Sequence, residues 1–183
     1  LSLTGGSGNA SELKNYANVF QGGGTGTGQT ITVGGGGDIS VQGGSSAGQD
    51  VGMDNGSFAF ITSDGDSQLI QFSAPGSAIT ITGGTVGSLN YAGFSARVAG
   101  ATQTVKGTVA ANNPTITITG GASGGTATED NSGGIYTAGN QFVNSGAMLL
   151  RGGASGTGNG ASAAAPNQTV VVKGNLTLHG GAN

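Results

Sequence analysis

The chain has 183 residues, of which 41 are glycine, three are proline and none is cysteine, and its formal net charge is −3. The low proline content and the absence of a strict Gly-X-Y period exclude a collagen helix, and the absence of a basic stripe argues against a nucleic-acid partner. No apolar run reaches the roughly 20 residues of a membrane-spanning helix, so we expect no membrane insertion. Clusters of Ile, Val and Leu at period two favour ordered β-structure over the disorder of many glycine-rich chains.

Six copies of a short motif run along the chain, each with four residues that alternate apolar with mostly polar ones, followed by Gly-Gly. The copies begin at residues 1, 39, 79, 116, 148 and 176, and their starts are 38, 40, 37, 32 and 28 residues apart. Spacings in this range indicate a repeat architecture. Residues two apart share a face of a strand, so the motif predicts an inward apolar column and an outward column rich in Ser and Thr. The glycines predict a corner whose φ values a residue with a Cβ resists.

Two further motifs keep phase with the first. A small residue followed two positions later by a mostly apolar one occurs at Ala17, Ala59, Ala96, Gly134 and Ala161. A Gln followed two positions later by an apolar residue occurs at Gln29, Gln68, Gln103, Gln141 and Gln168. Each repeat is therefore interpreted as three short strands, with a variable loop after Gly-Gly and a tight turn before Gln.

Three short strands per turn, stacked in register, are typical of a parallel β-helix, with a rise of about 4.8 Å per turn. The sequence thus predicts an all-β chain with five to six turns. We expect residues 1–183 to form a single β-solenoid domain.

The five glutamines share the inward face of their strands with the apolar residues that follow them. A buried amide without a hydrogen-bond partner costs about 1–3 kcal/mol. Its natural partner in a stacked structure is the amide one repeat away, as in the side-chain ladders of other stacked sheets. We therefore predict a structural Gln ladder; glutamines that line a binding groove are the functional alternative.

The motifs at Leu1–Gly6, Asn15–Val19 and Gln29–Val33, and again over Asn167–Gly181, resemble the repeats of large bacterial exoproteins of the filamentous-haemagglutinin type. The resemblance covers essentially the whole chain. It implies a right-handed β-helical shaft, secretion through a partner pore in the outer membrane, and a role in adhesion or biofilm formation.

The acidic residues give little support for an enzyme. Polysaccharide lyases and glycosidases need carboxylates that converge on one face, but most of the eight acidic residues fall in the variable loops, at different repeat phases. A turn before Gln68 accounts for Asp64 and Asp66. We expect no catalytic residues.

A structural calcium ion is a weaker hypothesis. Carboxylates and loop carbonyls are the ligands that calcium prefers, and the candidates are Asp50, Asp54, Asp64 and Asp66. We expect no other cofactor, because a single histidine, His179, without cysteine makes no zinc site.

The last motif, Leu176–Gly181, returns to the phase of Leu1, so the sequence reads as an uncapped repeat. Two interpretations stay open: a segment of a longer covalent fibre, or a subunit that stacks end to end with copies of itself. Both favour a structural or adhesive extracellular fibre of a bacterial surface or biofilm, in contact with polysaccharide or the cell surface.

A carbohydrate-binding module is the alternative function, and it predicts a cluster of exposed aromatic residues. The aromatics near the second strand are Tyr16, Phe58, Phe60, Tyr91, Phe94 and Tyr136. A polysaccharide lyase and an ice-binding protein, the latter suggested by Thr80, Thr82, Thr117 and Thr119, rank lower.

Overall fold

The computed structural model describes residues 1–8, 15–46, 57–87, 89–123, 131–155 and 158–181. Within these ranges the chain is all-β, apart from one 3₁₀ turn, η1 (Ala110–Asn112), and all its strand pairings are parallel. No helix in this part of the chain has the length and apolar character needed to span a membrane. The variable loops expected after the Gly-Gly pairs fall largely outside the described residues.

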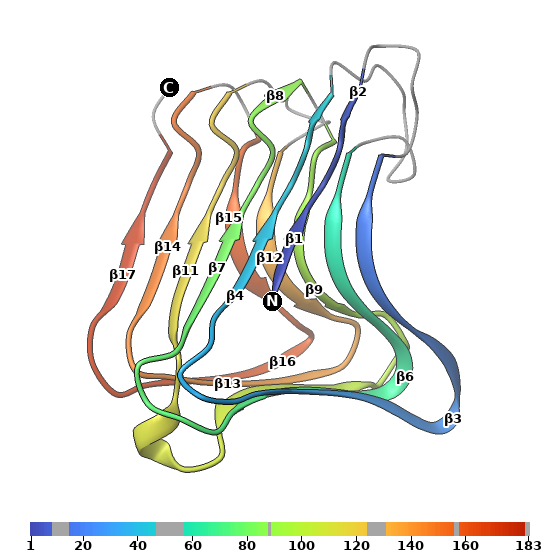
Figure 1. Ribbon diagram of the computed structural model, residues 1–183, viewed down its shortest axis with the longest axis vertical. Coiled ribbons are helices and arrows are strands. Elements are labelled where there is room, and N and C mark those ends of the chain that lie inside the picture. The colour runs from blue at the N-terminus through green and yellow to red at the C-terminus, as the bar shows by residue number, and fades with distance from the viewer. Residues whose placement is uncertain (9–14, 47–56, 88, 124–130, 156–157, 182–183) are drawn as a thin grey trace.

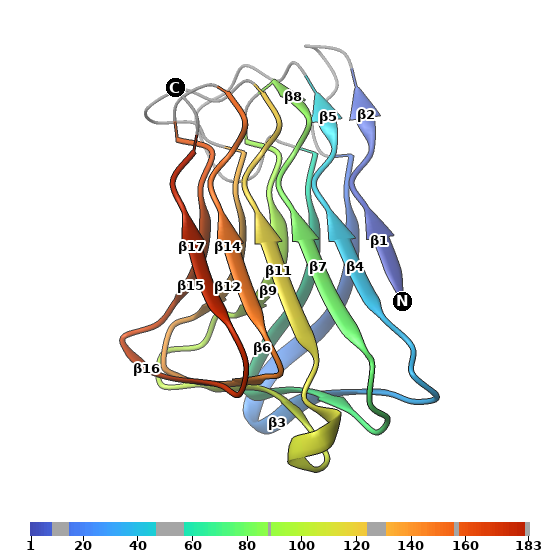
Figure 2. The ribbon, with the colours of Figure 1, turned by 90° about the vertical axis from the view of Figure 1, so that its left-hand side faces the viewer.

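Each of the six Gly-Gly motifs contributes one strand to a six-stranded parallel sheet, called the first sheet below. Its order is β1 (Ser2–Thr4), β4 (Ile39–Gln42), β7 (Ala78–Thr82), β11 (Thr115–Thr119), β14 (Met148–Arg151) and β17 (Leu176–His179). Figure 2 shows these strands side by side, in chain order from right to left. The register pairs equivalent positions of successive motifs, such as Ile79 with Ile39 and Ile116.

The second sheet has eight strands: β3 (Ala17–Val33), β6 (Ala59–Phe72), β9 (Ala92–Ala96), β10 (Thr102–Gly107), β12 (Gly133–Thr137), β13 (Asn140–Ser145), β15 (Ala161–Ala164) and β16 (Asn167–Val172). The long strand β6 pairs with β3 on one side. On its other side, the first half of β6 pairs with β9 and the second half with β10. From there the sheet continues as two branches, β9-β12-β15 and β10-β13-β16.

A third, small sheet follows the first three Gly-Gly pairs and consists of β2 (Ser7–Gly8), β5 (Ser45–Ser46) and β8 (Val86–Gly87). The chain therefore passes from the first sheet to the second and back in every repeat (Figure 1).

The core lies between the first sheet and the two branches of the second. Alternate residues of each strand point into it, as the period-two pattern predicts. The first sheet supplies Ile39, Val41, Ile79, Ile81, Ile116 and Ile118; the second supplies Ile61, Phe94, Ile135, Ile70, Val105 and Val143. All twelve side chains are at most 1% exposed, so the hydrophobic interior is continuous across the middle repeats.

The division into three strands holds only for the later repeats. The prediction of a tight turn before Gln29 and Gln68 is wrong, because β3 and β6 each continue through that point as one strand. Asp64 and Asp66 consequently lie within β6 and not in a turn. In β3 the extra residues are absorbed by register shifts between Gln21 and Gly24 and between Gly24 and Gly28.

Two of the expected small-residue positions are also wrong. The register pairs Ala59 with Ala92, and Ala92 with Gly133, so the third and fourth repeats use Ala92 and Gly133 in place of Ala96 and Gly134. The inward partners are then Phe94 and Ile135, both fully buried. Glycine and alanine are so frequent in this chain that a two-residue pattern matches at neighbouring positions by chance.

The prediction that the Gly-Gly pairs are needed for unusual φ values is wrong as well. No glycine of the six pairs has a positive φ in the structure. The constraint is space: a Cβ on Gly43, Gly83 or Gly120 would lie less than 3.0 Å from a backbone carbonyl oxygen at the start of the second sheet in the following repeat. The first sheet ends so close to the second that only glycine fits.

This close approach gives the first testable prediction. Gly120→Ala would place a Cβ against the Asn159 carbonyl oxygen, whereas Gly180→Ala, at the equivalent position of the last motif, would have no atom within 4 Å. We expect Gly120→Ala to lower the free energy of unfolding by about 1–3 kcal/mol, as other overpacked sites do, and Gly180→Ala to change it by less than about 0.5 kcal/mol. Urea unfolding followed by circular dichroism measures both. Equal effects would contradict the steric explanation.

Candidate functional site

A column of glutamine side chains lies where the two branches of the second sheet meet. The strand register aligns Gln29, Gln68, Gln103, Gln141 and Gln168 in successive repeats. From Gln68 onward, each Nε2 donates to the Oε1 of the preceding glutamine, at 2.8 Å for Gln68 to Gln29 and 2.7 Å for the next two pairs; Gln168 donates to Gln141 in the same way.

The same amides also connect the two branches. Gln141 Nε2 donates to the carbonyl oxygen of Ile135 on the other branch at 3.0 Å, and Gln168 Nε2 donates to that of Ala163 at 2.9 Å. Gln68 Nε2 makes the equivalent bond to Ile61 within β6, at 3.0 Å. Gln68 and Gln103 are fully buried. The column therefore satisfies polar groups inside an apolar core, which is a structural role, and none of its inner members is open to a ligand.

A second polar column lies at the corner after each Gly-Gly pair. Asn90 Oδ1 accepts from the backbone N–H of Ser57 at 3.0 Å, Asn131 Oδ1 from that of Asn90 at 2.9 Å, and Asn159 Oδ1 from that of Asn131 at 3.0 Å. The carbonyl oxygens of the same asparagines accept from Gly84, Gly121 and Gly153, the second glycines of the pairs. This column holds the two sheets together at the corner.

Sequence reasoning missed the asparagine column, although a signal was present. An Asn stands two positions before the small residue that begins each second-sheet strand in four of five repeats, at Asn15, Asn90, Asn131 and Asn159. The exception is Ser57, whose shorter side chain cannot make the equivalent bond. Its buried Oγ has no hydrogen-bond partner among the described residues.

The calcium candidates are not gathered into a site in the described part of the chain. Asp50 and Asp54 lie outside the described residues. Both oxygens of Asp64 are bound by Arg97, at 2.7 Å each, and this guanidinium lowers the pKa of the carboxyl below its ordinary value. Asp66 Oδ2 accepts from the Gly26 N–H at 2.6 Å. No group of three or more His, Cys, Asp or Glu residues comes together within the described ranges.

The aromatic residues form a short stack on the outer side of the second sheet. The rings of Tyr16 and Phe58 are parallel within 2°, with centroids 4.9 Å apart, and Phe60 lies 5.8 Å from Phe58 at a tilt. Tyr16 and Phe58 thus stack face to face, and Tyr16, at the first repeat, is 58% exposed. The stacked pair joins the first two repeats, and this contact by itself is a packing role. Phe94 belongs to the core.

The outer side of the first sheet is polar and almost uncharged over its first four strands. Its two outward columns carry Ser2, Thr4, Ser40, Gln42, Thr80, Thr82, Thr117 and Thr119. The pattern changes in the last two strands, where Leu149, Arg151, Thr177 and His179 take the same positions. Arg151 and His179 are therefore neighbours on the outer surface.

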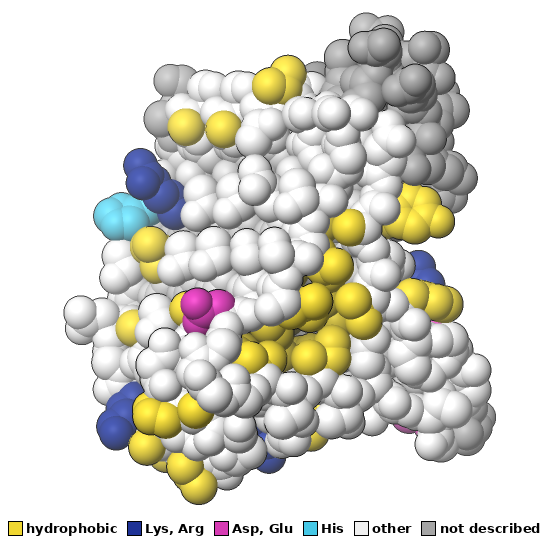
Figure 3. Space-filling view, viewed as in Figure 1, with side chains coloured by type: hydrophobic (Ala, Val, Ile, Leu, Met, Phe, Trp, Pro, Cys, Tyr) yellow, Lys and Arg dark blue, Asp and Glu magenta, His cyan; other side chains and the backbone are white. Residues whose placement is uncertain are grey.

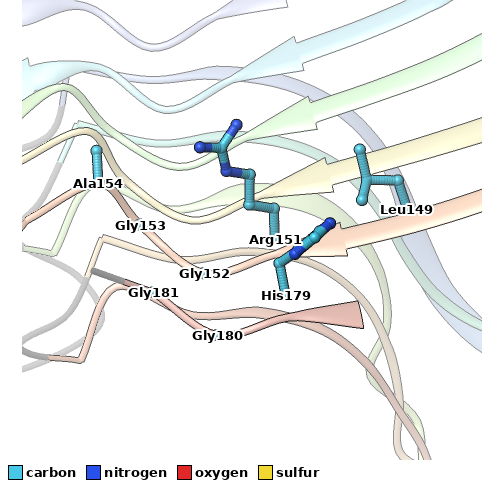
Figure 4. Close-up of a pocket in the computed structure, with 8 residues that line it drawn as sticks. All are labelled: Leu149, Arg151, Gly152, Gly153, Ala154, His179, Gly180 and Gly181. Carbon is cyan, nitrogen blue, oxygen red and sulfur yellow. The ribbon is translucent and has the colours of Figure 1, made fainter. Parts of the chain in front are cut away.

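These two side chains border an open depression of about 480 Å³, with Leu149, Ala154 and the glycines of the last two Gly-Gly pairs as its other walls. Figure 4 shows Arg151 and His179 projecting from adjacent strands above the bare backbone of Gly152 and Gly180. Both side chains are exposed.

Comparison with known proteins gives no match: no protein-family model, no curated protein and no solved structure corresponds to the chain.

The buried glutamine column generates a prediction about stability. Gln103→Leu would leave Gln68 Oε1 without its donor inside the core, and an orphaned buried acceptor costs about 1–3 kcal/mol. Gln71→Leu is the matched control, because Gln71 is on the outward side of β6 and its amide donates to the exposed Thr32 hydroxyl. We expect the first variant to melt at a clearly lower temperature than the second. An unchanged melting temperature for Gln103→Leu would show that the ladder contributes nothing.

The asparagine column allows two substitutions to be compared at equivalent positions of different repeats. Asn131→Ala would orphan the buried N–H of Asn90 and free the carbonyl oxygen of Ser123, to which Asn131 Nδ2 donates at 3.0 Å. Ser57→Ala, two repeats earlier, would remove only an unpartnered hydroxyl. We expect a loss of about 1–3 kcal/mol in the free energy of unfolding for Asn131→Ala and less than about 0.5 kcal/mol for Ser57→Ala. Chemical denaturation of both variants tests this, and similar losses would refute it.

Proposed function

We propose that this chain is a segment of a right-handed parallel β-helix, or β-solenoid, and that it serves as structural or adhesive fibre material on a bacterial surface or in a biofilm. The repeated passage from first sheet to second and back, with parallel pairing throughout, supports the solenoid. Right-handedness is expected because parallel strands joined by a crossover have that hand in nearly all cases.

The observation that carries the proposal is the contrast between the middle of the core and its two ends. Ile79 and Ile118 in the middle of the first sheet are fully buried. The inward-facing residues of the last strand, Leu176 and Leu178, are 54% and 68% exposed, and Leu1 at the opposite end is 50% exposed. Both ends therefore present core-type side chains to solvent.

The apolar end faces match each other in composition and in position. At the first repeat, Leu3, Val19, Ile31 and Val33 are only half-buried, and Figure 3 shows hydrophobic side chains gathered there between β1 and β3. At the last repeat, Val170 lies on the same inward column as Ile31, four repeats away. An edge with free backbone groups and an apolar interior is a template for another strand. We propose that a like repeat covers each face, supplied either by the same polypeptide in a longer fibre or by a second copy of the chain.

The outer surface supports an extracellular, adhesive role. Its first-sheet columns are mainly hydroxylated, and only 7% of the whole chain is charged. Such a surface suits hydrated contact with polysaccharide or with neighbouring fibres. We assign no reaction, cofactor or metal to the chain, and we propose that it lies outside the cell.

An association experiment tests the end faces. We expect the purified chain to form linear assemblies as its concentration is raised, measured by sedimentation velocity and electron microscopy. Leu178→Asp would place a charge against the apolar column of an added repeat and should abolish assembly, because a buried unpaired charge costs several kcal/mol.

Thr177→Asp introduces the same charge on the same strand but on its outward side, and it should leave assembly intact. A wild-type chain that stays monomeric at all concentrations, or two variants that behave alike, would overturn end-to-end stacking.

A further inference from the structure

We propose that the depression between Arg151 and His179 binds the carboxylate groups of an acidic polysaccharide. This inference names the ligand class of the proposed adhesive surface, and it rests on that proposed function for its biological meaning. The site itself is argued from four features of the outer face of the first sheet.

The first feature is an uncompensated cation. The structure gives Arg151 no ion pair or hydrogen bond among the described residues, in contrast to Arg97, whose guanidinium is held by Asp64. An arginine carries a permanent charge and a planar set of donors that matches a carboxylate in bidentate fashion. His179 lies opposite Arg151 in the register of β14 and β17 and adds a further donor on the same surface.

The second feature is the shape of the surface. The walls of the depression include Gly152, Gly153, Gly180 and Gly181, whose lack of side chains leaves open space beside Arg151 and His179. Its volume of about 480 Å³ falls within the range typical of small-ligand sites. A bulky, hydrated group such as a sugar ring therefore has room to lie against the backbone.

The third feature is the absence of a competing anion on the outward positions. The described residues of the two outward columns include no Asp or Glu. In Figure 3 the histidine lies beside a basic side chain, with no acidic side chain next to either. None of these described outward side chains repels an anion that approaches this corner.

The fourth feature is the polar face that leads away from the depression. Thr119 and Thr82 continue the column of Arg151 across β11 and β7, and Thr117 and Thr80 continue the column of Leu149. Threonine hydroxyls donate and accept hydrogen bonds and match the hydroxyls of a sugar chain. A ligand with many hydroxyls and a carboxylate fits this combination. A phosphate polymer does not, because its affinity depends on a series of cations, and Arg151 is the one permanent cation among the described residues of the two outward columns.

The experiment measures binding of the full chain to immobilised polygalacturonate at low salt, with the fully methyl-esterified polymer as a matched neutral ligand. We expect binding to the charged polymer only, and weaker binding as salt is raised. Arg151→Gln should weaken it about fivefold or more, since one charge-assisted bidentate contact per site is lost, and His179→Gln should weaken it to a smaller extent.

Lys106→Gln is the control variant. Lys106 lies on β10 of the second sheet, away from the depression, and its substitution by Gln removes one positive charge, as Arg151→Gln does. It should bind like the wild type. Equal weakening by Lys106→Gln would show that only net charge matters, and unchanged binding by Arg151→Gln would remove the site; either result overturns the inference. Equal binding of the esterified polymer would do the same, as would a preference for a polyphosphate of equal length.

None of these outcomes depends on end-to-end assembly. A chain that assembles but does not bind polygalacturonate contradicts the carboxylate site alone. A chain that binds it but stays monomeric contradicts the stacking alone.

Discussion

The close contact between the Gly-Gly corner and the asparagine column determines how the two main sheets meet. The second glycine of a pair donates to the carbonyl oxygen of the asparagine in its own repeat, as Gly84 does to Asn90 at 2.7 Å. The asparagine side chain in turn accepts from the backbone of the preceding repeat. One corner thus fixes both the distance between the sheets and the alignment of successive repeats. The columns of apolar residues and glutamines depend on that alignment, because each must meet its equivalent directly one repeat away.

The sequence was sufficient for the features that repeat in every unit. The phase of the Gly-Gly strands and of the glutamines could be read from spacing alone, because Ile, Val and Gln are scarce enough in this chain for a repeated pair to be informative. The same argument fails for small residues. Ala96 and Val98 fit the motif as well as Ala92 and Phe94 do, and only the backbone pairing of β9 with β6 and β12 distinguishes them.

Other features could not have been predicted, for physical reasons. A glycine pair looks the same in the sequence whether it is needed for a positive φ or for the close approach of two backbones. The reason for Gly83 or Gly120 is therefore seen only when the neighbouring repeat is in place. The segment from Gly22 to Gly28 reads as a turn, yet it remains in β3 because β6 pairs with it on both sides of its bulges. The depression beside Arg151 likewise depends on the next strand, which brings His179 into register.

The length of the segments varies between repeats, while the residues at their ends stay aligned. Ala17 and Gln29 are 12 positions apart in the first repeat, while Ala161 and Gln168 are seven apart in the last. Even so, both ends of each segment stay in their columns, because the difference is taken up by bulges in β3 and by short corners between later strands. Loops of different length cost little if their ends are held. This explains how repeats of 28 to 40 residues form one continuous core.

The glutamine column gives the molecule a direction along the stack of repeats. All four amide-to-amide bonds run the same way, from each repeat to the one before it. The amide dipoles therefore add along the axis instead of cancelling, and the molecule has a chemical direction as well as a structural one. Beyond Gln168 an incoming amide meets an acceptor, whereas two such termini brought together would set oxygen against oxygen. Any lengthening of this column is consequently vectorial, with every added unit pointing the same way as the last.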